Sequence, residues 1–143
     1  MKYKVLLVLF IISFASSLTL SLKPVSEICD LNKGCEVVHY SQYNFTFGIQ
    51  NSHYGVFIFL FLILLTSSQI VKPKKNKETA IKLLVIIGSL IVVYFLYIQE
   101  FVLNAYCKYC LLVDFSLLLA LIVILSELKE DVKKISGKWT KEI

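Results

Sequence analysis

Four cysteines, arranged as two closely spaced pairs, are the residues of this sequence best suited to chemistry. Cys107 and Cys110 form a C-x-x-C motif, and Cys29 and Cys35 are separated by five residues rich in turn formers. Two thiols at such spacings can close and reopen a disulfide, so each pair predicts thiol–disulfide exchange. The alternative is that either pair is a structural disulfide.

The C-x-x-C motif precedes an apolar run that is predicted to be a helix. Cys107 and Cys110 would then lie three residues apart on one face of that helix. The free amides at a helix N-terminus and the neighbouring Lys108 ammonium both favour thiolate over thiol. We therefore expect at least one of these sulfurs to be reactive near neutral pH.

The composition predicts a membrane protein that carries these cysteines on helices. Of the 143 residues, 57% are hydrophobic and only 17% are charged, which argues against a water-soluble domain, a disordered chain and a nucleic-acid-binding protein. Apolar runs at 5–22, 54–71, 80–99 and 109–126 approach the roughly 20 residues that cross a bilayer as a helix. We predict an all-α, four-transmembrane-helix bundle as a single domain over 1–143.

The first apolar run has a second interpretation. Lysines before it and small residues near Ala15 also fit a cleavable signal peptide. The run continues to Leu22, which favours a retained helix.

The lysines predict the orientation. Twelve of the fifteen lie before the first run, between the second and the start of the third (up to Lys82), or after the fourth. The positive-inside rule then places both termini in the cytoplasm. The 23–53 loop and all four cysteines would lie outside, on the oxidising side. The 127–143 tail is predicted to be a solvated cytoplasmic extension of the last helix, or else a basic patch on lipid headgroups.

Four cysteines permit three pairings. The local one, Cys29 with Cys35 and Cys107 with Cys110, leaves a mobile dithiol on the outer loop and a fixed dithiol at the membrane face. Such pairs can pass electrons through a mixed disulfide. A zinc site built from all four thiolates is the alternative, although an oxidising side favours disulfides and we expect no metal.

These motifs resemble the vitamin K epoxide reductase family. The resemblance covers about residues 29–115 and rests on several motifs in a fixed order. In that order they are Cys29 and Cys35, Ser41, 47–49, 51–55, 97–103, and Cys107 with Cys110. The order differs from DsbB-type oxidases, which carry the C-x-x-C in the first outer loop.

The resemblance implies a four-helix bundle that encloses a quinone beneath the first outer loop. It implies that Cys29 exchanges with a protein partner and that Cys35 attacks Cys107, while Cys110 lies nearest the quinone. Ser41 corresponds to a loop hydroxyl near the active cysteines of the family. Asn51 resembles a residue that hydrogen-bonds a quinone oxygen in some members.

A quinone is flat and apolar and has two carbonyl acceptors, so its pocket needs apolar walls and a few donors. The Asn51 amide is a suitable donor, and Phe47, Tyr54 and Tyr106 are candidate walls. Asn51 could instead cap the second long helix.

Asp114 lies one turn beyond Cys110 within the last apolar run, where an ionisable residue is a functional candidate. Our hypothesis is that it assists proton delivery to the quinone. The alternative is that it reaches water, pairing with Lys108. The family's vertebrate enzymes have a tyrosine near this position, which weakens the expectation of epoxide chemistry. His39 and His53 are interpreted as interfacial or loop residues.

We therefore predict a membrane thiol:quinone oxidoreductase that generates disulfides. Its thiol partner would be a separate thioredoxin-like or DsbA-like protein, and its acceptor would be ubiquinone, menaquinone or vitamin K. One alternative is a reductase whose main role is to reduce vitamin K quinone or its epoxide. The other is a non-enzymatic membrane scaffold stapled by two disulfides.

Overall fold

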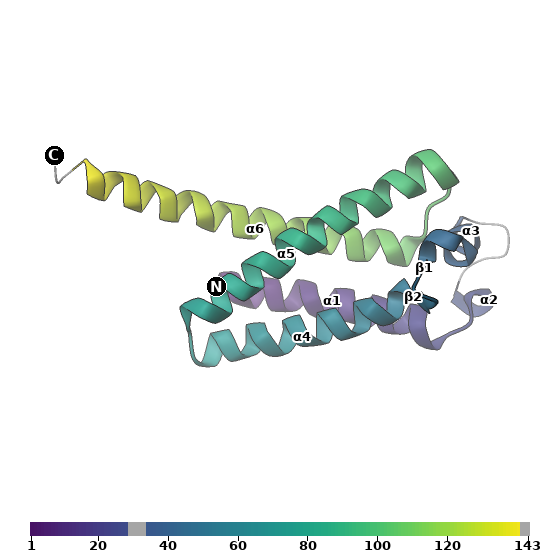
Figure 1. Ribbon diagram of the computed structural model, residues 1–143. Helices are drawn as coiled ribbons and strands as arrows, with labels where there is room; N and C mark the ends of the chain where they lie inside the picture. Colours follow the sequence, from purple (N-terminus) through teal and green to yellow (C-terminus); the bar gives the residue numbers. More distant parts are fainter. Residues whose placement is uncertain (29–33, 141–143) are drawn as a thin grey trace.

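The computed structural model describes residues 1–28 and 34–140, and four of the helices in these ranges form an elongated bundle (Figure 1). The long helices are α1 (Lys2–Leu22), α4 (Asn51–Val71), α5 (Lys75–Tyr97) and α6 (Lys108–Trp139). A π-helical turn, η2 (Ile98–Leu103), continues α5. All four are long and apolar enough to cross a membrane, as predicted.

The bundle is held together by an apolar core. Helix α1 packs against α4 and α6, and α5 packs against α6. The core residues are Leu6, Phe10, Phe59, Leu62, Ile81, Val85, Val92, Leu117, Ala120 and Ile124. Many other large apolar side chains point outward, which suits helices surrounded by hydrocarbon rather than water.

The helix boundaries differ from the predicted spans mainly at polar ends. The third span begins at Lys75 rather than at 80 and runs through η2 to Leu103, while the fourth continues to Trp139. Charged residues at these ends can remain in a helix because their side chains reach water, so hydropathy marks the apolar part and not the whole helix. The extension of α6 beyond 127 is helical and largely exposed, as predicted.

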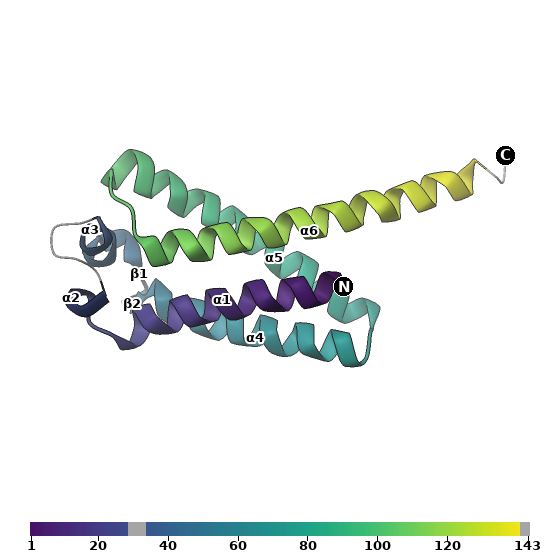
Figure 2. The same ribbon diagram turned by 180° about the vertical axis from the view of Figure 1, so that it is seen from behind.

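The lysine-rich segments gather at one end of the bundle. The N-terminus, the α4–α5 connection and the extension of α6 all lie there (Figure 2). Lys82 pairs with Glu78 and Asp131, and Lys2 pairs with Glu130. The segments that carry Cys35, Cys107 and Cys110 lie at the opposite end.

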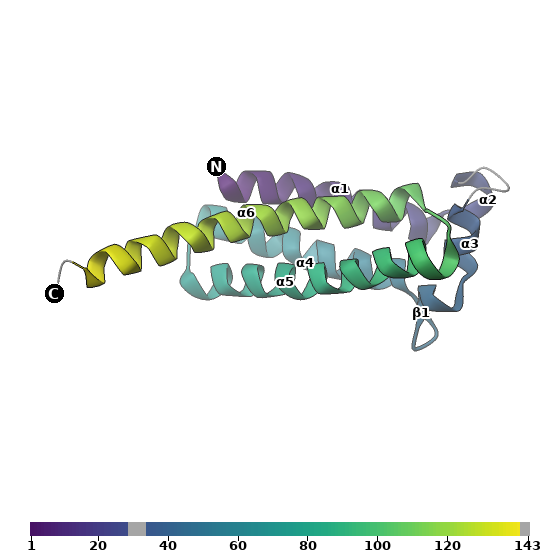
Figure 3. The same cartoon turned by 90° about the horizontal axis from the view of Figure 1, so that it is seen from above.

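The loop between α1 and α4 covers that opposite end. It contains α2 (Val25–Ile28), α3 (Cys35–Tyr40), the short 3-10 helix η1 (Gln42–Asn44) and a hairpin of β1 (Phe45–Thr46) and β2 (Ile49–Gln50). Thr46 pairs with Ile49 across the hairpin. The two turn residues between them have positive φ, as a tight two-residue hairpin requires. The hairpin projects to one side of the bundle (Figure 3).

Candidate functional site

The loop and the last helix bring two cysteines together. Cys35 is the first residue of α3 and Cys107 is the N-cap of α6, and both are buried. Their Sγ atoms lie 3.3 Å apart although 72 residues separate them in the chain. This is the contact that the resemblance implies for the relay. Cys29, the expected contact with the partner, lies outside the described residues.

The two sulfurs are in different redox states. Cys35 is disulfide-bonded, whereas Cys107 and Cys110 are free thiols. A thiolate at Cys107 therefore faces a disulfide sulfur at close range. Disulfide exchange proceeds by such an approach, so the geometry is one step from a Cys35–Cys107 mixed disulfide.

Gly34 permits the close approach of the loop to α6. A Cβ atom at this position would lie 2.6 Å from the backbone nitrogen of Tyr106 and 3.1 Å from the Cα of Ala105. Backbone atoms cannot move aside as a flexible side chain can. Any larger residue must therefore push the start of α3, and Cys35 with it, away from the segment that leads to Cys107.

The surroundings of Cys107 favour its thiolate. The Cys110 thiol donates toward Cys107, and the backbone amides of Cys110 and Tyr109 add further donors at the start of α6. Together they lower the pKa of Cys107 to about 7 despite the opposing effect of burial. The reactive sulfur that the sequence predicts at this helix N-terminus is thus assigned to Cys107.

A cavity of about 430 Å³ lies beneath the loop, within the range of small-molecule sites. Its walls come from all four long helices and from the loop. The apolar lining residues include Leu20, Val38, Ile58, Phe59, Leu62, Leu84, Ile91, Val92, Phe95, Ile98, Leu103, Val113 and Leu117. Cys107, Cys110 and Asp114 also line it, so the reactive sulfurs open onto this cavity.

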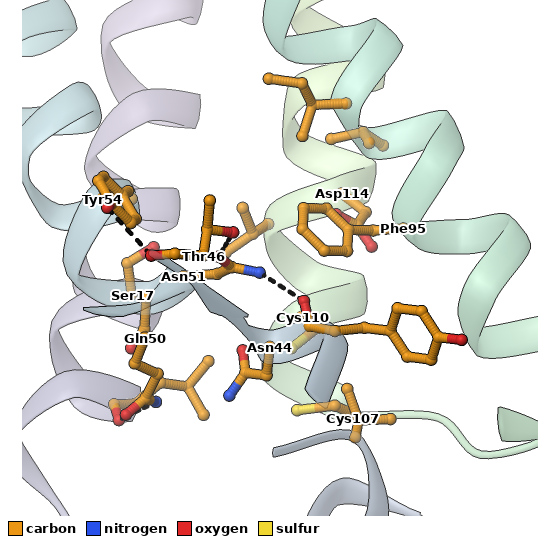
Figure 4. A pocket seen from close by; sticks show the side chains of 18 of the residues that line it. Ser17, Asn44, Thr46, Gln50, Asn51, Tyr54, Phe95, Cys107, Cys110 and Asp114 are labelled. Atoms are coloured by element: carbon orange, nitrogen blue, oxygen red, sulfur yellow. Dashed lines mark hydrogen bonds between the residues drawn. The ribbon is translucent and has the colours of Figure 1, made fainter. Parts of the chain in front are cut away.

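Asn51 and Tyr54 face the cavity from α4, opposite Cys110 and Asp114 on α6 (Figure 4). The Asn51 amide donates to the Tyr43 carbonyl at 2.9 Å, and its oxygen accepts from the Thr46 hydroxyl at 2.8 Å. Asn51 therefore holds the loop and does not cap α4 through its side chain. An amide nitrogen has two hydrogens, so one remains for a ligand.

The other predicted wall residues differ in position. Tyr54 lines the cavity and donates to the Thr46 carbonyl at 3.2 Å. Phe47 lines the rim but is 97% exposed at the hairpin tip. Tyr106 lies outside the cavity, half exposed, with its hydroxyl bonded to Glu100, so the prediction of Tyr106 as a wall is not supported. The chain turns between Leu103 and Cys107 and places Tyr106 outside the cavity. Residue spacing alone does not reveal this turn.

The supporting residues lie at the site. Ser41 lines the cavity, and its hydroxyl donates to the Val38 carbonyl at the end of α3. Asp114 is 6% exposed, and one carboxylate oxygen accepts from Gln99 at 3.4 Å. Lys108 is exposed at the surface, so the alternative of an Asp114–Lys108 pair is wrong.

Some cavity residues were not predicted as site residues. His39 lines the cavity beside Gln50, and burial lowers the pKa of His39, which favours the neutral imidazole. Ser52 lines it with a hydroxyl oxygen that is buried and has no hydrogen-bond partner among the described residues. Gln99 is 3% exposed between Cys107 and Asp114. For Gln99, the signal available in the sequence was a glutamine within an apolar run.

No group of three metal-ligating side chains occurs within residues 1–28 and 34–140. His53 is exposed in the first turn of α4. The described site combines closely spaced sulfurs with an apolar cavity and a few polar groups, an arrangement that can support exchange between sulfurs.

Comparison with protein families identifies one match. The model of the vitamin K epoxide reductase family matches residues 4–125, which include both cysteine pairs and the cavity. Comparison with curated proteins finds no match. The family match confirms the resemblance that the spaced motifs indicated.

We predict that Gly34→Ala weakens the contact between the two sulfurs. In a two-cysteine protein (Cys29→Ser with Cys110→Ser), equilibrium with glutathione measures the effective concentration of Cys35 and Cys107. The added methyl group should lower this value by about tenfold or more, because it overlaps backbone atoms. Gly137→Ala, in the exposed tail with open space around it, is the control and should change nothing. An unchanged value for Gly34→Ala would contradict the role of the close approach.

We also predict that Cys107 titrates near neutrality. In a Cys29→Ser, Cys35→Ser protein, the ultraviolet absorbance of thiolate should rise with a midpoint at about pH 7. Because the pKa is lowered, the thiolate is present above this pH and lost below it. The transition should disappear in the same protein with Cys107→Ser. A midpoint at the ordinary thiol value of about 8.5 would show that the helix start does not activate this sulfur.

Proposed function

Since the chain belongs to the vitamin K epoxide reductase family, we propose that it is a membrane thiol:quinone oxidoreductase that generates disulfides. This family membership and the four apolar helices make it an integral membrane protein of an oxidoreductase family. The observation that carries the finer proposal is the 3.3 Å contact between the Cys35 and Cys107 sulfurs. A scaffold stapled by inert disulfides has no need of a thiol against a disulfide sulfur.

The relay begins when a dithiol partner protein reduces the loop disulfide through Cys29 and is itself oxidised to a disulfide. The Cys35 thiolate then attacks Cys107 of the Cys107–Cys110 disulfide, and Cys110 leaves as a thiolate. Attack of Cys29 on Cys35 closes the loop disulfide and releases Cys107. Two electrons have then moved from the partner to the Cys107–Cys110 dithiol. At this last stage the loop disulfide is closed and both α6 thiols are free.

A bound quinone would supply the acceptor for two electrons and two protons and would leave as the quinol. Both α6 sulfurs line the cavity, but Cys107 is engaged with Cys35, so the Cys110 sulfur delivers the electron pair. Cys107 then forms the disulfide with Cys110 and regenerates the oxidised pair. Cys35 and Cys107 are buried under the loop, which limits access of water to the exchange between them.

The cavity residues fit a quinone. The walls are largely aliphatic and aromatic, as a flat apolar ring requires. The unpartnered Ser52 hydroxyl and the second amide hydrogen of Asn51 are donors for a carbonyl oxygen on the α4 side. Asp114 faces the cavity from α6 and can carry a proton from the dithiol toward the opposite oxygen.

The cysteine end of the bundle is proposed to lie on the outer side of the membrane, with both termini in the cytoplasm. The lysines gather at the other end, which the positive-inside rule assigns to the cytoplasm. A thioredoxin-like or DsbA-like protein in the outer compartment would then reach the loop. Electrons would flow from that compartment into the quinone pool of the membrane.

Mapping of disulfides by mass spectrometry tests the proposal. Quinone added to the fully reduced protein should produce the Cys107–Cys110 disulfide first and then the loop disulfide, with quinol formed in equal amount. Cys110→Ala should abolish quinol formation. A disulfide pattern that quinone does not change would favour the scaffold. Turnover is then measured with ubiquinone, menaquinone and vitamin K epoxide as acceptors, and at least one of the quinones should be reduced. Acceptance of the epoxide alone would contradict disulfide generation as the main role.

We predict that Asp114→Asn slows quinone reduction by at least about tenfold across neutral pH, because an amide cannot relay a proton. Single-turnover oxidation of the reduced protein by quinone measures the effect. Oxidation of the same variant by a soluble dithiol oxidant should be unchanged, which separates proton delivery from damage to the cysteines. Ser116→Ala, which removes another buried polar group of α6 outside the cavity lining, is the matched control. An unchanged rate with Asp114→Asn would exclude the proton role.

A further inference from the structure

A buried glutamine lies between the reactive helix start and the acid in the cavity. Gln99 belongs to the π-helical turn η2, and its side chain is 3% exposed. Its Oε1 accepts from the backbone N–H of Cys107 at 3.4 Å, and its Nε2 donates to Asp114 at 3.4 Å. Burial of an amide in an apolar helix is costly unless both of its ends are satisfied. Here each end is satisfied by a residue of the site.

The backbone around Gln99 is shaped to make this bridge. The turn η2 ends at Asn104, which adopts the left-handed conformation with φ 46° and reverses the chain. The carbonyl of Gln99 then accepts the N–H of Ala105 at 3.1 Å. The backbone carbonyl of Gln99 thus binds Ala105, and its side chain binds Cys107. One residue therefore holds both ends of this short segment.

This segment is also the one that the loop touches. Gly34 packs against Ala105 and Tyr106 directly before Cys35 begins α3. The position of the Cys107 sulfur opposite Cys35 therefore depends on how firmly the segment is held from the bundle side. Gln99 in η2 holds the segment through its hydrogen bonds to Ala105 and Cys107, while Gly34 permits the close contact with the loop.

We propose that Gln99 is a positioning residue that acts on two partners at once. Its carbonyl oxygen fixes the backbone of Cys107, so that the sulfur stays within reach of Cys35. Its amide nitrogen orients the Asp114 carboxylate toward the cavity. This inference deepens the proposed function and rests on it for the role of Asp114, but the positioning of Cys107 is a property of the chain itself.

Two substitutions separate the two contacts. Gln99→Leu removes the acceptor and the donor together. Gln99→Glu keeps an acceptor for the Cys107 N–H but places a second carboxyl group against Asp114. Gln69→Leu is the matched control, because Gln69 is equally buried and bonds the backbone of Lys74 at the other end of the bundle.

The first measurement uses the two-cysteine protein (Cys29→Ser with Cys110→Ser) in equilibrium with glutathione. Gln99→Leu should lower the effective concentration of Cys35 and Cys107 by about tenfold, the effect of losing a buried hydrogen bond. Gln99→Glu and Gln69→Leu should stay within about twofold of the parent. Since no quinone or partner takes part, this result decides the positioning of Cys107 even if the proposed function is wrong. A value that Gln99→Leu leaves unchanged would overturn the inference.

The second measurement is single-turnover quinone reduction by the full chain. Gln99→Glu should slow it by about tenfold when Asp114 is present and have little further effect in an Asp114→Asn background, because both changes act on one contact. Equal slowing in both backgrounds would overturn the action through Asp114. Absence of quinone reduction by the unaltered protein would instead refute the proposed function.

Discussion

The contact between the Cys35 and Cys107 sulfurs is the constraint on which the rest of the structure depends. Exchange between sulfurs needs direct approach, so a loop and a helix from distant parts of the chain must be held at 3.3 Å. Gly34 removes the atoms that would prevent this approach. The loop elements α3, η1 and the hairpin cover this end of the bundle, and α3 holds Cys35 against the start of α6.

The bilayer imposes a second constraint on the same residues. Hydrocarbon cannot satisfy polar groups, so each one within the bundle must find a partner in the protein or in a ligand. Most of the polar groups that line the cavity are bonded to one another, as Asn51 is to Tyr43 and Thr46. The Ser52 hydroxyl oxygen is buried at the cavity and has no partner among the described residues, so it is free to bond a ligand.

Much of this fold followed from the sequence. Apolar runs of about 20 residues predict helices wherever the solvent is lipid, and the lysines mark one end of the bundle. The cysteine pairs and the family motifs predicted a sulfur relay, and several of the predicted residues on α4 and α6 line the cavity. Tyr106 was misplaced and Gln99, His39 and Ser52 were missed, because their positions depend on the π-helical turn, the reversal at Asn104 and the packing of the loop. The π-helical turn, the chain reversal and the loop packing leave no signal in hydropathy or in local spacing.

The sequence by itself determined the solvent, the helices and the chemistry, because apolar length, charge and thiol content are local properties of the chain. Only the tertiary structure decided that the Cys35 sulfur contacts the Cys107 sulfur. It also decided that donors at the start of α6 surround Cys107, that Asp114 is bonded to Gln99 and not to Lys108, and that Asn51 is bonded to the loop. Each of these depends on distances between residues far apart in the chain, and such distances exist only once the helices have packed.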